Sequence, residues 1–188
     1  MKEVKITVVG KTPLLMNRFT EENEVKVSSG VTKVGVGDRG TPREQAEKTA
    51  YVDKKGFLYI PGPNMFAALI EAGKYHKSGK SKVTTQKSSM VPAGISLEEM
   101  VMSLGTKEFE VDSRSVVIPT TGGRIMRHRA RLDKWELTFT LDVDTEMFAM
   151  DFVRTLVDDA GKRIGLGDYR PDRKGPFGKF VVKKWEEN

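Results

Sequence analysis

The sequence predicts a single α+β domain whose elements follow the order β-α-β-β-α-β. Two stretches, 61–73 and 145–160, repeat their apolar residues every three to four positions, as amphipathic helices do. Asp144 or Thr145 is expected to be the N-cap of the second helix. Other runs, such as 3–8 and 135–143, alternate apolar and polar residues, which indicates strands with one buried face. A chain of 188 residues is long enough for one hydrophobic core.

The composition favours an anionic partner and excludes several kinds of chemistry. There are 32 Lys and Arg against 26 Asp and Glu, which gives a net charge of +6. The absence of cysteine excludes disulfides, thiolate catalysis and cysteine-ligated zinc. Because no apolar run reaches the length of a membrane span and the chain starts without the apolar region of a signal peptide, we expect a cytoplasmic protein that contacts no membrane.

The first predicted strand alternates Val4, Ile6 and Val8 with polar residues and is interrupted at Pro13. Arg18 follows the strand and is a candidate phosphate contact at its edge. The next stretch is polar and glycine-rich, so the chain is expected to leave the core there.

Residues 20–56 are predicted to form an insertion. A short helix within it should begin at Thr41, because Thr41 and Glu44 have the spacing of a capping box and Pro42 suits the first helical turn. The strand that follows, over 57–60, leads into the helix that begins at 61–63.

Two short motifs have the spacing of nucleotide-binding loops, and neither predicts a cofactor. The glycines within 35–40 match a dinucleotide fingerprint but lack the strong apolar strand that must precede it. Gly79-Lys80-Ser81 resembles the end of a P-loop, yet Lys74 occupies the position of its first glycine. We therefore expect no bound cofactor and no metal site.

A second insertion, over 75–112, begins with a basic arm. Lys77, Lys80 and Lys82 stand among Ser, Thr and Gly, and no acidic residue occurs from 72 to 97. Such a charged stretch can bury little of itself, so we expect a mobile arm whose lysines contact nucleic acid, or alternatively a solvated loop without a partner.

A row of arginines is expected on the first strand of a hairpin. Side chains alternate along a strand, so three of the arginines share one face and a fourth opens the strand. These residues are Arg127, Arg129, Arg131 and, at the opening, Arg124. Like charges on one face repel, which favours an anionic partner, with neutralisation by the acidic segment 108–112 as the alternative. Asp133 and Lys134 are predicted to form the tight turn to the second strand, over 135–143.

The stretch 161–180, after the second helix, combines glycines with basic residues. Glycine adopts positive φ and allows close approach, so this density predicts a shaped loop. Its amides and cations could bind phosphate oxygens, or the loop could be a connector that needs glycine for its turns. The candidate residues are Tyr169, Arg170, Arg173 and Lys174 among Gly165, Gly167, Gly175 and Gly178.

The element order is that of ferredoxin-like and RRM-like domains. Within it, IPGPNMFAALIEAGK resembles the helix start, and IGLGDYRPDRKGPFGKFVV the signature glycine-rich loop, of the RAMP superfamily of CRISPR systems. The resemblance implies a RAMP-like core over 1–19, 57–74 and 113–188, with an inserted β-hairpin and basic loops. It also implies a backbone subunit that binds single-stranded guide RNA along a filament, or a stand-alone or virus-encoded relative of such subunits.

The sequence therefore predicts a protein that binds nucleic acid without sequence preference and that forms a homo-oligomer or part of a ribonucleoprotein complex. The resemblance favours RNA over DNA. One alternative is a metal-independent endoribonuclease with His76 or His128 as general base, although His128 is expected to be a structural residue that faces away from the arginines. Another alternative is a viral or protein-interaction module whose basic face meets an acidic protein.

Overall fold

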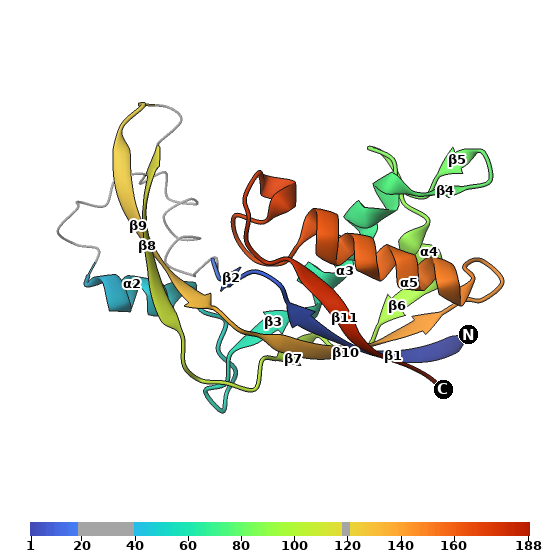
Figure 1. The fold of residues 1–188 in the computed structure, drawn as a ribbon, viewed down its shortest axis with the longest axis horizontal. Coiled ribbons are helices and arrows are strands. Elements are labelled where there is room, and N and C mark those ends of the chain that lie inside the picture. Colours follow the sequence, from blue (N-terminus) through green and yellow to red (C-terminus); the bar gives the residue numbers. More distant parts are fainter. Residues whose placement is uncertain (19–39, 118–120) are drawn as a thin grey trace, which may run out of the picture.

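A four-stranded antiparallel sheet with helices on one face forms the body of the molecule (Figure 1). The computed structural model describes residues 1–18, 40–117 and 121–188. In chain order, the elements of the body are β1 (Lys2–Gly10), α3 (Gly62–Ala72), β6 (Ile95–Leu97), β10 (Glu136–Val143), α5 (Met150–Asp159) and β11 (Phe180–Glu187). The strand order is β11-β1-β10-β6, and each neighbouring pair is antiparallel. The predicted α+β class is confirmed.

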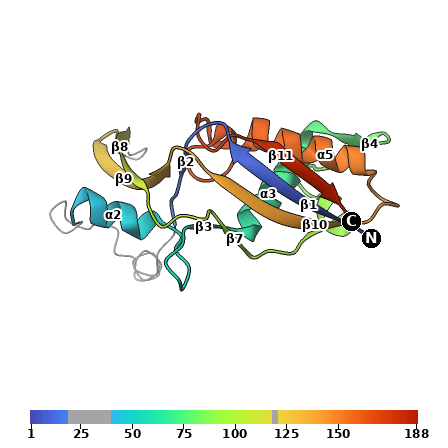
Figure 2. The ribbon, with the colours of Figure 1, turned by 60° about the horizontal axis from the view of Figure 1, so that its bottom comes forward.

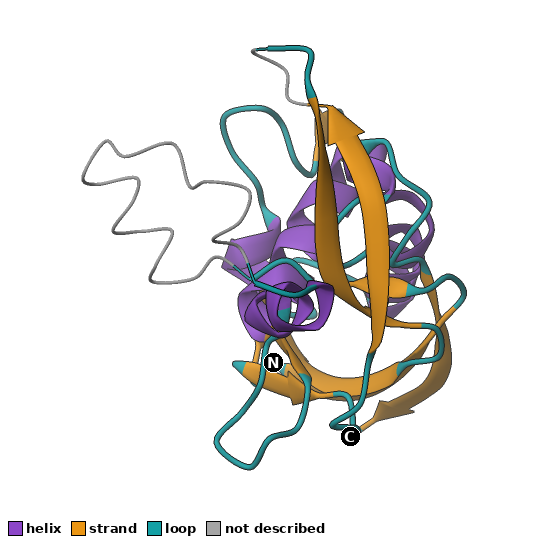
Figure 3. Cartoon of the chain, turned by 90° about the vertical axis from the view of Figure 1, so that its left-hand side faces the viewer, coloured by secondary structure: helices purple, strands orange, loops and turns teal. Residues whose placement is uncertain are grey.

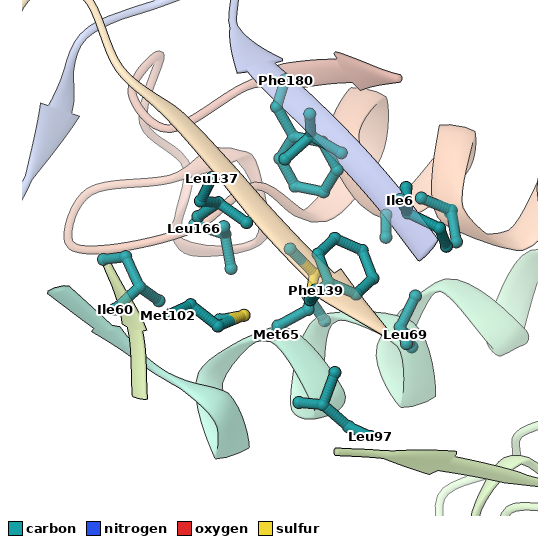
Figure 4. Close-up of a cluster of buried hydrophobic side chains, with 14 of the residues drawn as sticks. Ile6, Ile60, Met65, Leu69, Leu97, Met102, Leu137, Phe139, Leu166 and Phe180 are labelled. Carbon is teal, nitrogen blue, oxygen red and sulfur yellow. The ribbon is translucent and has the colours of Figure 1, made fainter. Parts of the chain in front are cut away.

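The hydrophobic core lies between this sheet and the helices α3 and α5. Val4, Ile6 and Val8 of β1 point into the core and are fully buried, as their alternation predicts. Figure 4 shows Ile6 and Phe139 of neighbouring strands beside Leu69 of α3. The opposite face of the sheet comes forward in Figure 2, with the helices behind it.

A second, smaller sheet projects from the body, as Figures 1 and 3 show. It has the order β2-β9-β8, and its strands are β2 (Leu14–Leu15), β8 (Glu110–Val117) and β9 (Arg124–Leu132). Helix α2 (Pro42–Thr49) packs against it, and the Thr49 hydroxyl accepts a hydrogen bond from the Ala130 amide at 3.0 Å. Helix α2 thus packs against the base of the β8–β9 hairpin.

Short elements complete the described chain. Two strand pairs lie outside the two larger sheets, and short helical turns precede or follow α3 and α5. These elements are β3 (Tyr59–Pro61) with β7 (Val101–Ser103), β4 (Lys77–Ser78) with β5 (Ser81–Lys82), the 3-10 turns at Gly73–Tyr75 and Pro171–Arg173, the π-helical turn at Ala160–Ile164, and α4 (Val91–Gly94).

Two helix starts test the capping predictions. At α2, Thr41 is the N-cap, and the capping box with Glu44 is present as predicted. At α5, the expected cap at Asp144 or Thr145 is wrong, because the helix begins at Met150 after Ala149. Asp144 instead accepts a hydrogen bond from the Glu146 amide at 3.0 Å and so stabilises a turn before the helix.

The expected hairpin over 124–143 is also wrong. β9 pairs with β8 and β2, whereas β10 pairs with β1 and β6, so the chain passes from one sheet to the other at Asp133 and Lys134. Trp135 fixes this passage, because its carbonyl accepts from the Gly10 amide at 2.8 Å and its indole donates to the Thr12 carbonyl at 2.9 Å.

The core also includes a strand from one of the predicted insertions. The sequence places 75–112 in an insertion, but Ile95–Leu97 of this segment form β6 and pair with β10. Most of the other predicted insertion, including the glycines of the dinucleotide-like motif before Gly40, lies outside the described residues. None of the helices in the described ranges is long and apolar enough to cross a membrane.

Candidate nucleic-acid interface

The glycine-rich loop, residues 165–180, owes its glycines to turns and to close packing. Gly178 has a φ of +72°, and a Cβ placed there would lie 1.8 Å from the Leu166 carbonyl oxygen. Gly167 has a φ of +75°, and a Cβ placed there would lie 2.3 Å from the Leu15 carbonyl oxygen. Side chains at these positions would be strained and would collide with the backbone, so the loop can form only with glycine there.

Several loop amides are occupied within the protein. The amides of Leu166, Gly175 and Gly178 donate to the carbonyls of Gly178, Arg170 and Pro13 at 2.8 to 3.0 Å. The expectation that loop amides bind phosphate is therefore wrong at these positions, and the alternative of a structural connector holds for them. Any anion binding by this part of the loop must come from its side chains.

The β8–β9 hairpin rests on the glycine-rich loop. Arg129 Nε of β9 lies 2.5 Å from Asp168 Oδ2, and both side chains are mostly buried. The contact is poorly aligned for a hydrogen bond, so its attraction is mainly that of two opposite charges. On the neighbouring strand, the Arg114 guanidinium lies 4.5 Å from the centre of the Phe177 ring. These contacts bring two elements far apart in the sequence together.

Acidic side chains neutralise part of the arginine row. Asp112 is 4% exposed and lies 2.6 Å from Arg114 and 3.6 Å from Arg131. Its hydrogen bonds raise the pKa of the Arg114 guanidinium, and a bond to Asp133 is the main cause that raises the pKa of Arg131. The alternative of neutralisation by the segment 108–112 therefore applies to Arg131, whereas Arg129 is neutralised by Asp168 of the loop.

Arg170 also has a structural role. Its guanidinium donates to the Gly167 carbonyl at 3.1 Å and to Asp172 at 3.3 Å, which holds the loop in shape. Tyr169 has a φ of +48° and a 44% exposed side chain, and its ring lies 6.1 Å from that of Phe177. This ring is the part of the loop that offers a stacking surface to a base.

The remaining candidate cations are exposed. Arg173 is 69% exposed, although Asp172 lies 3.5 Å from it. Arg127 is exposed and lies opposite Arg114 across the hairpin. The other cations form no ion pair with another residue in the described ranges: Arg18, Lys77, Lys80, Lys82, Arg124 and Lys174.

The basic arm lies apart from this surface. Its lysines are carried by the β4–β5 pair, at the other end of the molecule from the β8–β9 hairpin in both Figure 1 and Figure 2. The base of the arm is buried at Val83 and Thr84, whose amides donate to the carbonyls of His76 and Gly73. The arm is therefore a short hairpin with an anchored base rather than a stretch that buries nothing.

Both histidines have partners. His128 Nδ1 lies 2.7 Å from the Ser113 hydroxyl across the hairpin. His76 Nε2 lies 3.0 Å from Asp159 Oδ2, and its ring meets Phe152 edge to face. His76 directly precedes β4 and His128 lies on β9, at opposite ends of the molecule (Figures 1 and 2), so the two histidines do not form one site.

The open face of the main sheet offers a different kind of surface. The positions of β1 and β10 that alternate with the core residues are Glu3, Lys5, Thr7, Val9, Glu136, Thr138, Thr140 and Asp142. None of them is aromatic, so these two strands provide no ring on which a base could stack. The hairpin and the loop remain the stronger candidate interface.

Sequence reasoning missed Asp168 as a partner of the arginines, and Arg114 and Phe177 as contacts between hairpin and loop. Their residue types gave a weak signal, since a single aspartate in a basic loop has many possible partners. The packing of the hairpin on the loop, which no local pattern encodes, would have been needed to find them. Asp112, by contrast, lies in the acidic segment 108–112 that the sequence offered as a neutralising partner.

Comparison with known proteins bears on the fold. The sequence matches no protein-family model and no curated protein. It is similar in structure to a chain of the Type III-B Cmr-beta bound to cognate target RNA, with a TM-score of 0.56 and 13% identity. The match covers 99% of this chain and 60% of the other, so the protein spans less than two thirds of that relative's length. At this identity, the two chains share a fold.

Proposed function

We propose that the protein binds single-stranded RNA, without sequence preference, through the β8–β9 hairpin and the glycine-rich loop. The observation that carries this proposal is the packing of Arg129 against Asp168, which joins the two elements. Exposed cations then extend over both, with Arg124 and Arg127 on β9 and Arg173 and Lys174 on the loop.

We further propose a ferredoxin-like topology and a relationship to the RAMP superfamily. The order β11-β1-β10-β6, with α3 and α5 as the two connecting helices, supports this assignment. In chain order, the second and third strands of this core are then β6 and β10, whereas the sequence predicts both of them within 124–143.

The choice of RNA over DNA rests on the structural relative, which belongs to a complex bound to cognate target RNA. By analogy, the protein would act as a subunit of a ribonucleoprotein complex or as a homo-oligomer along the strand. The lysines of the β4–β5 arm would provide a second, separate contact to the phosphate backbone.

The chemistry of the surface accounts for binding without sequence preference. Exposed Lys and Arg side chains attract phosphates and release the counterions bound to them, whatever the base. A stacked base on the Tyr169 ring would add affinity with little discrimination, because every base has an aromatic face. The ion-paired Arg129 and Arg131 shape the surface more than they bind RNA.

A titration of fluorescently labelled single-stranded RNA, followed by anisotropy at several salt concentrations, tests the proposal. The double variant R173A/K174A should bind more weakly, and its log affinity should fall less steeply with log salt, by about 0.7 for each phosphate that is no longer neutralised. K54A/K55A removes the same charge from an exposed turn away from this surface and should behave like the wild type. Equal affinities and slopes for both variants would contradict the proposal.

A further inference from the structure

An open groove of about 450 Å³ lies beside the passage from β9 to β10. One wall is formed by the segment 104–110 and the other by 131–136. In Figures 1 and 2, the segment 104–110 and the glycine-rich loop lie on opposite sides of this passage. The groove thus lies at the base of the hairpin, on the side away from the glycine-rich loop (Figures 1 and 2).

The floor of the groove is apolar and held in place. Trp135 lies directly against Gly10, where an added Cβ would come within 2.1 Å of the indole nitrogen, and its N–H is bonded to the Thr12 carbonyl. Phe109, on the other wall, is covered on one side by the Arg43 guanidinium, 4.0 Å from the ring centre. Because both rings are fixed by these contacts, the apolar surface of the groove is formed before any partner binds.

The rim of the groove is acidic, although the whole chain carries a net charge of +6. Four carboxylates line it, against two cations, Arg131 and Lys134. Two of the carboxylates are neutralised, Asp133 by Arg131 and Glu136 by Lys183. The other two, Glu108 and Glu110, are exposed and form no ion pair with another residue that the structure describes.

We propose that this groove binds a cationic segment of a partner protein, with an apolar side chain against Phe109 and the small exposed part of Trp135, and Lys or Arg side chains on Glu108 and Glu110. The volume falls within the range of about 300 to 1,000 Å³ that holds small ligands, which suits a few side chains of an extended peptide. The unpaired carboxylates repel phosphate, so the partner here is a protein and not RNA.

The test uses the whole protein, labelled with ¹⁵N, and a capped peptide of alternating lysine and leucine as the probe. The peptide should shift the Trp135 indole signal and the amide signals of 106–110 until they saturate, whereas the same peptide with glutamate in place of lysine should not. A W185F variant identifies the Trp135 signal, because the chain has two tryptophans.

A pair of variants with matched charge tests the role of the rim. E108Q/E110Q should lower the affinity for the lysine peptide by about fivefold, since each rim contact is an exposed charge pair. E146Q/E186Q changes two exposed carboxylates away from the groove and should leave the affinity unchanged. The proposal is overturned if the peptide causes no saturable shift, or if both double variants bind it equally.

The same spectra distinguish a separate partner from a second copy of this chain. Shifts of the groove signals that grow with protein concentration in the absence of peptide, and disappear in E108Q/E110Q, would show that the occupant is another copy. That outcome would also overturn the proposal. Concentration-independent spectra together with peptide binding support it.

Discussion

Arg129 Nε on β9 and Asp168 Oδ2 in the glycine-rich loop lie 2.5 Å apart, although the two residues are far apart in the sequence. This ion pair, together with Arg114 over the Phe177 ring, seats the projecting hairpin on the body. The pair neutralises Arg129, which the sequence assigns to nucleic acid. It also holds in place the strand that carries the exposed Arg124 and Arg127. The candidate interface therefore depends on an acidic residue as much as on its basic ones.

The first prediction concerns this ion pair. Arg129→Ala or Asp168→Asn should each destabilise the protein by about 1 to 2 kcal/mol, because each leaves the mostly buried partner without its counter-charge. Urea unfolding of both single variants and the double variant measures the coupling between them. Strictly additive effects would mean that the two side chains do not interact.

The second prediction concerns the packing of the loop. Gly178→Ala should cost more than about 2 kcal/mol, since the new methyl group meets the Leu166 carbonyl at 1.8 Å and the backbone has a positive φ. Gly79→Ala is the matched control, because Gly79 has a φ of +61° but nothing within 4 Å, and it should cost about 1 to 2 kcal/mol from the backbone alone. Equal losses in thermal or urea unfolding would remove the packing argument.

The third prediction concerns pH. The Thr41 amide, and next its hydroxyl, hydrogen-bond the Glu44 carboxylate and lower its pKa below the ordinary value. A carboxyl whose pKa is lowered by folding adds stability above its unfolded pKa, and this stability is lost as the pH falls through the folded pKa. Glu44→Gln should therefore lower the melting temperature at about pH 7 and have little effect at about pH 3. An E44Q effect that persists in acid would contradict the assignment.

The fourth prediction separates a binder from a metal-independent nuclease. His128 is hydrogen-bonded to Ser113, and His76 lies 3.0 Å from the Asp159 carboxylate, so both have contacts that need no catalytic role. Wild-type protein should leave labelled RNA whole in EDTA, and His128→Asn should bind RNA as the wild type does. Cleavage products that vanish in His128→Ala or His76→Ala would favour the nuclease instead.

Local signals in the sequence predicted local structure well. The Thr41 and Glu44 capping box needs only residues three apart, and it is present. The alternation from Leu137 to Val143 likewise marks β10 and its buried face. In both cases, the information lies within one turn or one strand.

Features that depend on distant partners could not be predicted in this way. Ile95–Leu97 form a core strand only because β10 offers an edge, and three residues carry no measurable period. Asp133 and Lys134 have the composition of a turn, but the contacts of Trp135 with Gly10 and Thr12 carry the chain into the other sheet. The arginines of β9 were recognisable from the sequence, and so was the acidic segment 108–112 that neutralises Arg131, whereas the pairing of Arg129 with Asp168 was not.

The most direct test of the central claim is ultraviolet crosslinking of the protein to single-stranded RNA that contains 4-thiouridine, followed by mass spectrometry of the peptides. If RNA lies across the hairpin and the loop, the crosslinked peptides should contain 124–129 and 169–174, with Tyr169 as a principal site. Crosslinks confined to the open face of β1 and β10, with none in those two segments, would contradict the account.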